Sequence, residues 1–191
     1  MTAHYIKPQA VHGHKLVFRD ARPDDALFIL GLRLDQKKGR YLSSTSPDVA
    51  QQRAWLERYA ADTTQIYFII ENLAGEAVGT VRLYDQRGDS FCWGSWIKSD
   101  HAPASFAIES ALMIYHYALH LGFTSAHFEV RRENTGVIAF HERFGARVVD
   151  QNEHELFFEL DGPALHAALE KFARFLPDGV HIDMPGCTLP G

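Results

Sequence analysis

The chain has 191 residues, of which 46% are hydrophobic, which is enough to build one domain of ordinary size around a full core. Its net charge of -5 and its lack of a long basic run argue against binding nucleic acid through phosphate neutralisation. No apolar run approaches the roughly 20 residues that span a bilayer, and no signal peptide is evident, so we expect a cytoplasmic protein without membrane contact.

The hydrophobic period changes repeatedly along the chain, which is typical of a mixed fold of helices and strands. A first strand is predicted at 16–21. Pro23 then opens a helix whose apolar face continues to Gly39, and Ser46 as N-cap predicts a second helix over 46–61. Three strands linked by turn-like segments follow as a predicted antiparallel meander: 66–71, 76–84 and 90–98.

A long amphipathic helix over 104–121 connects the meander to a strand at 126–131, and such a crossover makes the two flanking strands parallel. The remaining predicted elements are a helix at 135–144, strands at 147–150 and 155–160, and a helix at 161–175. We therefore predict an α/β (α+β) fold. Its mixed central sheet should have about six to seven strands, antiparallel in the first half, with helices on both faces.

The segment 131–146 joins a strand to a short amphipathic helix that stops at Gly145. Asn134 stands at the start of this helix and His141 lies two turns further on, so both side chains could face one ligand. Asparagine is also a common N-cap, and a role of Asn134 limited to capping stays open. His141 is likewise compatible with a surface histidine that has no function.

These residues and the order of elements over 16–160 resemble the GNAT superfamily of acyl-CoA-dependent N-acetyltransferases. The last motif of that family is an asparagine, a small or apolar residue three positions on, an aromatic residue seven on, usually tyrosine, and Gly-Phe at eleven and twelve. Asn134, Val137 and Gly145 match, whereas His141 replaces the tyrosine and Ala146 the phenylalanine. The resemblance implies that Asn134 binds the pantetheine arm of acetyl-CoA and that His141, with a near-neutral pKa, donates a proton near the thioester sulfur.

The resemblance further implies that the two parallel strands splay apart in the middle of the sheet. It identifies residues 15–160 as the acyl-CoA N-acyltransferase domain. Residues 1–14 would then be a polar leader, and 161–191 a C-terminal helix and tail of the same domain. Folds of this kind often pair through sheet edges or helices, which leaves a homodimer open.

The pyrophosphate loop of the family, Gln/Arg-x-x-Gly-x-Gly/Ala, corresponds here to Ala102, Ser105 and Ala107, of which only Ala107 fits. A helix N-terminus still presents free N–H groups and a positive dipole end to phosphate, and the Ser105 hydroxyl could add a donor. A backbone N–H near Ile97 or Lys98 is expected to bind the oxyanion. The predicted cofactor-binding residues are Ile97, Lys98, Ala104, Ser105, Phe106, Ala107 and Asn134.

Acetyl transfer requires a base for the amine, a donor for the oxyanion and a proton for the thiolate. The family often places a carboxylate two residues before a strand glycine; Gly94 is present, but the residue two before it is Cys92. We expect Cys92 to be a small buried residue rather than a nucleophile. The candidate bases are Glu129, Asp85 and a water relayed from His127 or Tyr84, and the predicted catalytic residues are His141, Glu129 and Asp85.

The family binds its acceptor between the first two helices, which indicates Ser43, Ser44 and Thr45, although these could also form an ordinary loop. Tyr84 and Trp96 complete the predicted substrate-binding residues, although core and sheet packing is the simplest explanation of Trp96. No metal site is predicted, and Cys92 and Cys187 are too far apart in sequence to suggest a cysteine zinc site.

The segments 40–46 and 51–56 look like those of GNAT enzymes that acetylate nucleotide-linked amino sugars, which is the favoured acceptor. They also look like the ribosomal-protein alanine acetyltransferases. The predicted partners are therefore acetyl-CoA and a small amine-bearing acceptor. An alternative from another class is a GNAT fold that has lost catalysis and binds acyl-CoA as a sensor or assembly module.

Overall fold

The computed structural model describes residues 2–186, which form one nine-stranded sheet with five α-helices; Cys187 lies outside the described residues. In chain order the elements are β1 (Ala10–His12), β2 (Leu16–Asp20), α1 (Ala26–Arg33), α2 (Val49–Tyr59), β3 (Ile66–Asn72), β4 (Ala77–Arg87), β5 (Ser90–Lys98), α3 (Phe106–His120), β6 (Ser125–Arg131), α4 (Thr135–Arg143), β7 (Arg147–Gln151), β8 (Glu155–Leu160), α5 (Gly162–Lys171) and β9 (His181–Asp183).

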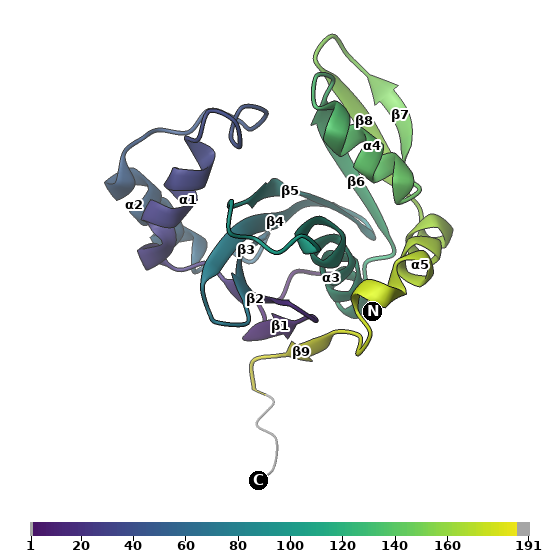
Figure 1. The fold of residues 1–191 in the computed structure, drawn as a ribbon, viewed down its shortest axis with the longest axis horizontal. Coiled ribbons are helices and arrows are strands. Elements are labelled where there is room, and N and C mark those ends of the chain that lie inside the picture. Colours follow the sequence, from purple (N-terminus) through teal and green to yellow (C-terminus); the bar gives the residue numbers. More distant parts are fainter. Residues whose placement is uncertain (1, 187–191) are drawn as a thin grey trace.

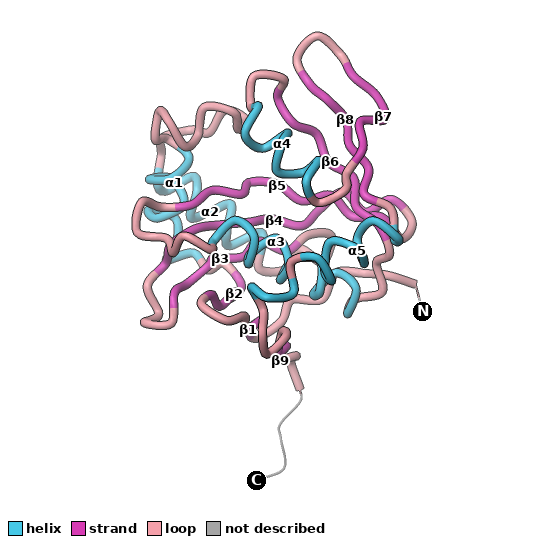
Figure 2. The backbone as a smooth tube through the Cα atoms, turned by 45° about the vertical axis from the view of Figure 1, so that its right-hand side comes forward, coloured by secondary structure: helices cyan, strands magenta, loops and turns pink. Residues whose placement is uncertain are grey.

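The strand order of the sheet is β7-β8-β6-β5-β4-β3-β2-β1-β9. All neighbouring strands are antiparallel except β5 and β6, which α3 connects as a parallel crossover. The predicted meander and parallel pair are therefore confirmed. Helices α1 and α2 lie on one face of the central strands, and α3 and α5 lie on the other (Figure 1, Figure 2). Within residues 2–186, no helix is long and apolar enough to cross a membrane.

The prediction of about six to seven strands was too low because two short strands come from the ends of the chain. In the segment expected to be a polar leader, β1 pairs with β2, and β9 pairs with β1 in turn. Val11 is fully buried, and His12 contacts Asp183 at 3.0 Å. Strands of three residues show no hydrophobic period, so their pairing depends on partners that are distant in the sequence.

The first two helices are shorter than predicted. Helix α1 ends at Arg33, and the chain folds back so closely that a Cβ at Gly39 would lie 1.8 Å from the Arg33 carbonyl oxygen. The N-cap of α2 is Asp48 rather than Ser46, because Asp48 Oδ1 accepts from the N–H of Ala50 at 2.8 Å. The longer connection between α1 and α2 is available to cover one face of the sheet.

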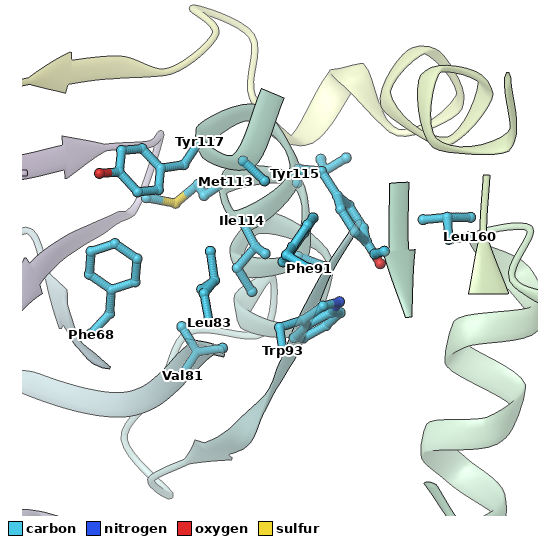
Figure 3. Close-up of a cluster of buried hydrophobic side chains, with 14 of the residues drawn as sticks. Phe68, Val81, Leu83, Phe91, Trp93, Met113, Ile114, Tyr115, Tyr117 and Leu160 are labelled. Atoms are coloured by element: carbon cyan, nitrogen blue, oxygen red, sulfur yellow. The ribbon is translucent and has the colours of Figure 1, made fainter. Parts of the chain in front are cut away.

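The main core lies between the sheet and α3. Side chains two apart on a strand share a face, so Val81 and Leu83 of β4 point toward α3, as Phe91 and Trp93 of β5 do (Figure 3). The same alternation turns Arg82, between Val81 and Leu83, toward the opposite face. A second, smaller apolar cluster packs α1 and α2 against β3 on the other face, where Arg82 also lies.

Candidate active site

The two parallel strands separate after three paired positions. Strands β5 and β6 pair at Ser90↔Ser125, Phe91↔Ala126 and Cys92↔His127, although β5 continues to Lys98 and β6 to Arg131. Figure 1 shows β6 diverging from β5 toward the strand β8. Peptide groups on the facing edges beyond Cys92 therefore have no partner in the ladder between these strands. This is the splay that the family resemblance implied.

A bulge in β5 accompanies the separation. Between the positions opposite Thr80 and Arg82, β5 has two residues, Ser95 and Trp96, where β4 has only Val81. Ser95 adopts a left-handed φ of 48°, and its carbonyl accepts a hydrogen bond from Thr80 Oγ1 at 2.8 Å. Because a bulge bends its strand, this feature accounts for the change in direction of β5 near the point where β6 leaves it.

His141 of α4 packs against both separated strands on the α3 side. Its ring centroid lies 4.0 Å from that of Phe128 on β6 and 5.2 Å from that of Trp93 on β5. The side chain is 4% exposed, and Nδ1 has no hydrogen-bond partner among the described residues. Burial lowers the pKa of His141 to about 3. The imidazole is therefore uncharged at pH 7, whereas the sequence suggested a side chain whose pKa is close to 7.

A cavity of about 250 Å³ opens where the strands separate. The predicted site residues that line it are Ser43, Tyr84, Trp96, Glu129, Asn134 and His141. Asn134 is the N-cap of α4, yet its side chain makes no capping hydrogen bond, so the amide is free for another partner. The Tyr41 hydroxyl donates to the Glu133 carbonyl at 3.1 Å, which ties the α1–α2 connection to the start of α4.

The structure separates the two predicted carboxylates. Glu129 lines the cavity, and burial together with the nearby Glu155 carboxylate raises the pKa of Glu129. Asp85 does not line this cavity; it accepts from Arg87 at 2.6 Å and contacts His127 Nε2 at 3.3 Å. Burial opposes the effect, but these hydrogen bonds lower the pKa of Asp85. Of these two carboxylates, Glu129 is therefore the one that lines the cavity and has a raised pKa, which makes it the stronger base.

The predicted phosphate-binding residues lie at the N-terminus of α3 and do not line the cavity. Ser105 Oγ donates to Glu109 Oε2 at 3.1 Å, so its proton is already used within the protein. Phe106 is 2% exposed, and its N–H donates to a carbonyl three residues earlier. Among the described residues, the N–H groups of Ala104, Ser105, Ala107 and Ile108 have no backbone acceptor, so they are available donors.

Ile97 and Lys98 continue to pair with β4, opposite Thr80 and Gly79. Neither lines the cavity, whereas the four residues 93–96 do. The peptide edge nearest the cavity therefore comes earlier in β5 than the sequence indicated, within and just before the bulge.

A second cavity of about 460 Å³ adjoins the first, since Arg82 and Ser95 line both. The predicted acceptor residues Ser44 and Thr45 line it. The lining residues that were not predicted include Arg33, Trp55, Arg58, Tyr67 and Arg82. No motif in the sequence marks these residues. They come together only because α1 and α2 pack on the sheet.

Comparisons with known proteins agree with this architecture. Residues 15–147 match the family model described as an acetyltransferase (GNAT) domain. Among solved structures, the apo form of FdhC, described as a nucleotide-linked sugar GNAT, shares 32% sequence identity at a TM-score of 0.75. That comparison covers 90% of this chain and 98% of FdhC.

Two more distant structures share the fold. A GCN5-related N-acetyltransferase from Brucella melitensis has 16% identity and a TM-score of 0.76, covering 93% of this chain and 90% of its own. The spermidine N-acetyltransferase from Vibrio cholerae, in complex with CoA and spermine, has 15% identity and a TM-score of 0.72, covering 80% and 98%. No match was found among curated proteins.

Replacing the buried histidine by phenylalanine is expected to remove a pH dependence of stability. The pKa of His141 is about 3 in the folded protein against 6.5 ordinarily, so the unfolded chain binds an extra proton between these values. The free energy of unfolding should therefore fall as pH drops below about 6.5, by on the order of 2 kcal/mol at about pH 5. His141→Phe should remove this contribution and leave that of His116, whose pKa burial also lowers.

Urea unfolding at about pH 8 and about pH 5 measures the effect. His154→Asn, on an exposed turn, is the matched control and should keep the dependence. An equal loss of stability in His141→Phe and in the unaltered protein would contradict the assignment.

Proposed function

Because the chain belongs to the GNAT acetyltransferase family, we propose that it transfers an acetyl group from acetyl-CoA to a primary amine carried by a nucleotide-linked sugar. The observation that supports this most is the pair of adjoining cavities that meet where β5 and β6 separate. Two substrates could reach that point from opposite faces of the sheet. The likeness to FdhC, a nucleotide-linked sugar GNAT, supports this class of acceptor.

Acetyl-CoA would supply a thioester whose carbonyl carbon an amine can attack. The chain offers three kinds of free polar group to hold it: the uncapped amide of Asn134, the open peptide edge of β5, and the free N–H groups at the start of α3. The first two suit the amides of a pantetheine arm. The last, at a helix N-terminus, suits a diphosphate.

Glu129 is the proposed base. The amine nitrogen bonds to the carbonyl carbon, the carbon–sulfur bond breaks, and the nitrogen loses a proton to Glu129. A carboxylate whose pKa is raised is better matched to this task than Asp85, whose pKa is lowered. His141 would assist the departing thiolate with a neutral N–H rather than as an imidazolium.

Transfer should be direct, within a ternary complex. Cys92 is the sole thiol within residues 2–186; it is 6% exposed, and burial raises its pKa to about 11. Such a thiol holds its proton at neutral pH and is a poor nucleophile. An acetyl-enzyme intermediate on Cys92 is therefore not part of the proposal.

Release of free thiol from acetyl-CoA in the presence of different amines tests the proposed function. Nucleotide-linked amino sugars should support turnover, because their amine can enter the cleft while the rest of the molecule occupies the larger cavity. Turnover confined to peptides with an N-terminal alanine would instead indicate a protein acetyltransferase. Thermal stabilisation by acetyl-CoA with no acceptor turned over would contradict the proposal and indicate a binding module.

Replacing the proposed base tests the mechanism separately. Glu129→Gln should lower kcat by about 100-fold, since general-base catalysis contributes on that order, with little change in acetyl-CoA affinity. Glu155→Gln is the matched control on the same cavity and should keep activity. Because it removes a negative charge that raises the pKa of Glu129, it should also move the acid limb of the pH–rate profile to lower pH. An unchanged kcat in Glu129→Gln would exclude Glu129 as the base.

A further inference from the structure

The larger cavity is lined by three arginines and no acidic residue. Arg33 comes from the end of α1, Arg58 from α2 and Arg82 from β4, and the described residues of the lining include neither aspartate nor glutamate. The chain as a whole carries a net charge of -5. The site is therefore positively charged although the whole chain is negatively charged. Its concave shape concentrates the electric field of the three arginines in the cavity.

These guanidinium groups are not neutralised by the protein. Arg33 donates to the neutral hydroxyls of Thr45 at 2.6 Å and Ser95 at 3.2 Å. Arg82 donates to the amide oxygen of Gln65 at 2.5 Å. Within residues 2–186, the guanidinium group of Arg58 makes no hydrogen bond or ion pair, although the backbone carbonyl of this residue accepts a hydrogen bond from the N–H of Ala61.

Five of the ten other arginines pair with carboxylates within residues 2–186. Arg19 with Asp25, Arg53 with Asp24, and Arg147 with Asp161 do so at 2.8 to 3.0 Å. The absence of such a partner from all three cavity arginines leaves their charge available to an anion from outside. Guanidinium groups bind phosphate oxygens in a two-pronged geometry.

A buried hydroxyl in the same lining also has no well-aligned partner. Tyr67 is 3% exposed, and its hydroxyl lies beside Arg33 and Thr80 without a well-aligned hydrogen bond to any described residue. Leaving a buried polar atom unsatisfied is costly, and a bound ligand or water is the usual explanation. The Tyr67 hydroxyl and the arginines therefore line one polar site, which is suited to a ligand with several oxygen atoms.

We propose that the cavity of Arg33, Arg58 and Arg82 binds the diphosphate of the acceptor. The inference rests on the proposed function and specifies how that acceptor is held. Arg82 and Ser95 line both cavities, so a diphosphate held here lies beside the cleft where the amine must arrive. The volume of about 460 Å³ is within the range of small-molecule sites. A polyamine, which carries positive charge throughout, is repelled by the same lining.

Isothermal titration with uridine diphosphate, thymidine diphosphate and inorganic pyrophosphate tests the site without any acetyl transfer. All three should bind, binding should weaken as salt rises, and thymidine and spermidine should not bind. Arg58→Gln should weaken diphosphate binding by about tenfold, the effect expected for one charge-assisted contact. Arg53→Gln, on the same helix but paired with Asp24 outside the cavity, should leave it unchanged.

Saturating CoA separates this site from the one for the acyl donor. Diphosphate binding that persists with CoA bound supports the proposal, and diphosphate displaced by CoA overturns it. Equal affinities in Arg58→Gln and Arg53→Gln also overturn it. If a nucleotide-linked amino sugar is acetylated but Arg58→Gln leaves its KM unchanged, the proposed function stands and the anion site fails. If diphosphates bind as expected but no such sugar is acetylated, the anion site stands and the acceptor fails.

Discussion

The separation of β5 from β6 is the constraint on which the rest of the structure depends. Two parallel strands that part in the middle of a sheet leave unpaired peptide groups and a gap in the core. On the α3 side, the ring of His141 packs on Phe128 and Trp93 and keeps the strands apart. Its neutral, buried state follows from this packing role, because a charged imidazole among aromatic rings would be strongly destabilising.

On the other face of the sheet, Arg33 organises the larger cavity next to the point where β5 and β6 separate. Arg33 connects α1 to both the bulge and the acceptor loop, through hydrogen bonds to Ser95 and Thr45. The bulge that redirects β5 and the loop that closes the larger cavity are therefore held by one guanidinium group. Two adjoining cavities result: arginines line the larger one, and Glu129, Asn134 and aromatic rings line the smaller one. This arrangement suits two substrates that meet at an acyl group and differ in chemistry on either side.

Features set by local periodicity could be predicted from the sequence, whereas features set by contacts between distant elements could not. The alternation in β4 and β5 and the long apolar face of α3 are local, so the meander and the parallel crossover were predicted correctly. Strands β1 and β9 are three residues long and exist only through each other and β2. Asn134 and Glu129 were found as candidates from motif and strand position, but the burial of His141 depends on rings from several elements. The three arginines come together only when α1, α2 and β4 are assembled.

A crystal structure with CoA bound tests the central claim most directly, because it locates the sulfur relative to the separated strands. The account predicts a pantetheine arm between β5 and β6, with its amides on the Asn134 side chain and on peptide groups of residues 93–96, and its diphosphate at the start of α3. The sulfur should lie within reach of the cavity that Glu129 lines. CoA bound elsewhere, with the cleft between β5 and β6 empty of it, would contradict the account.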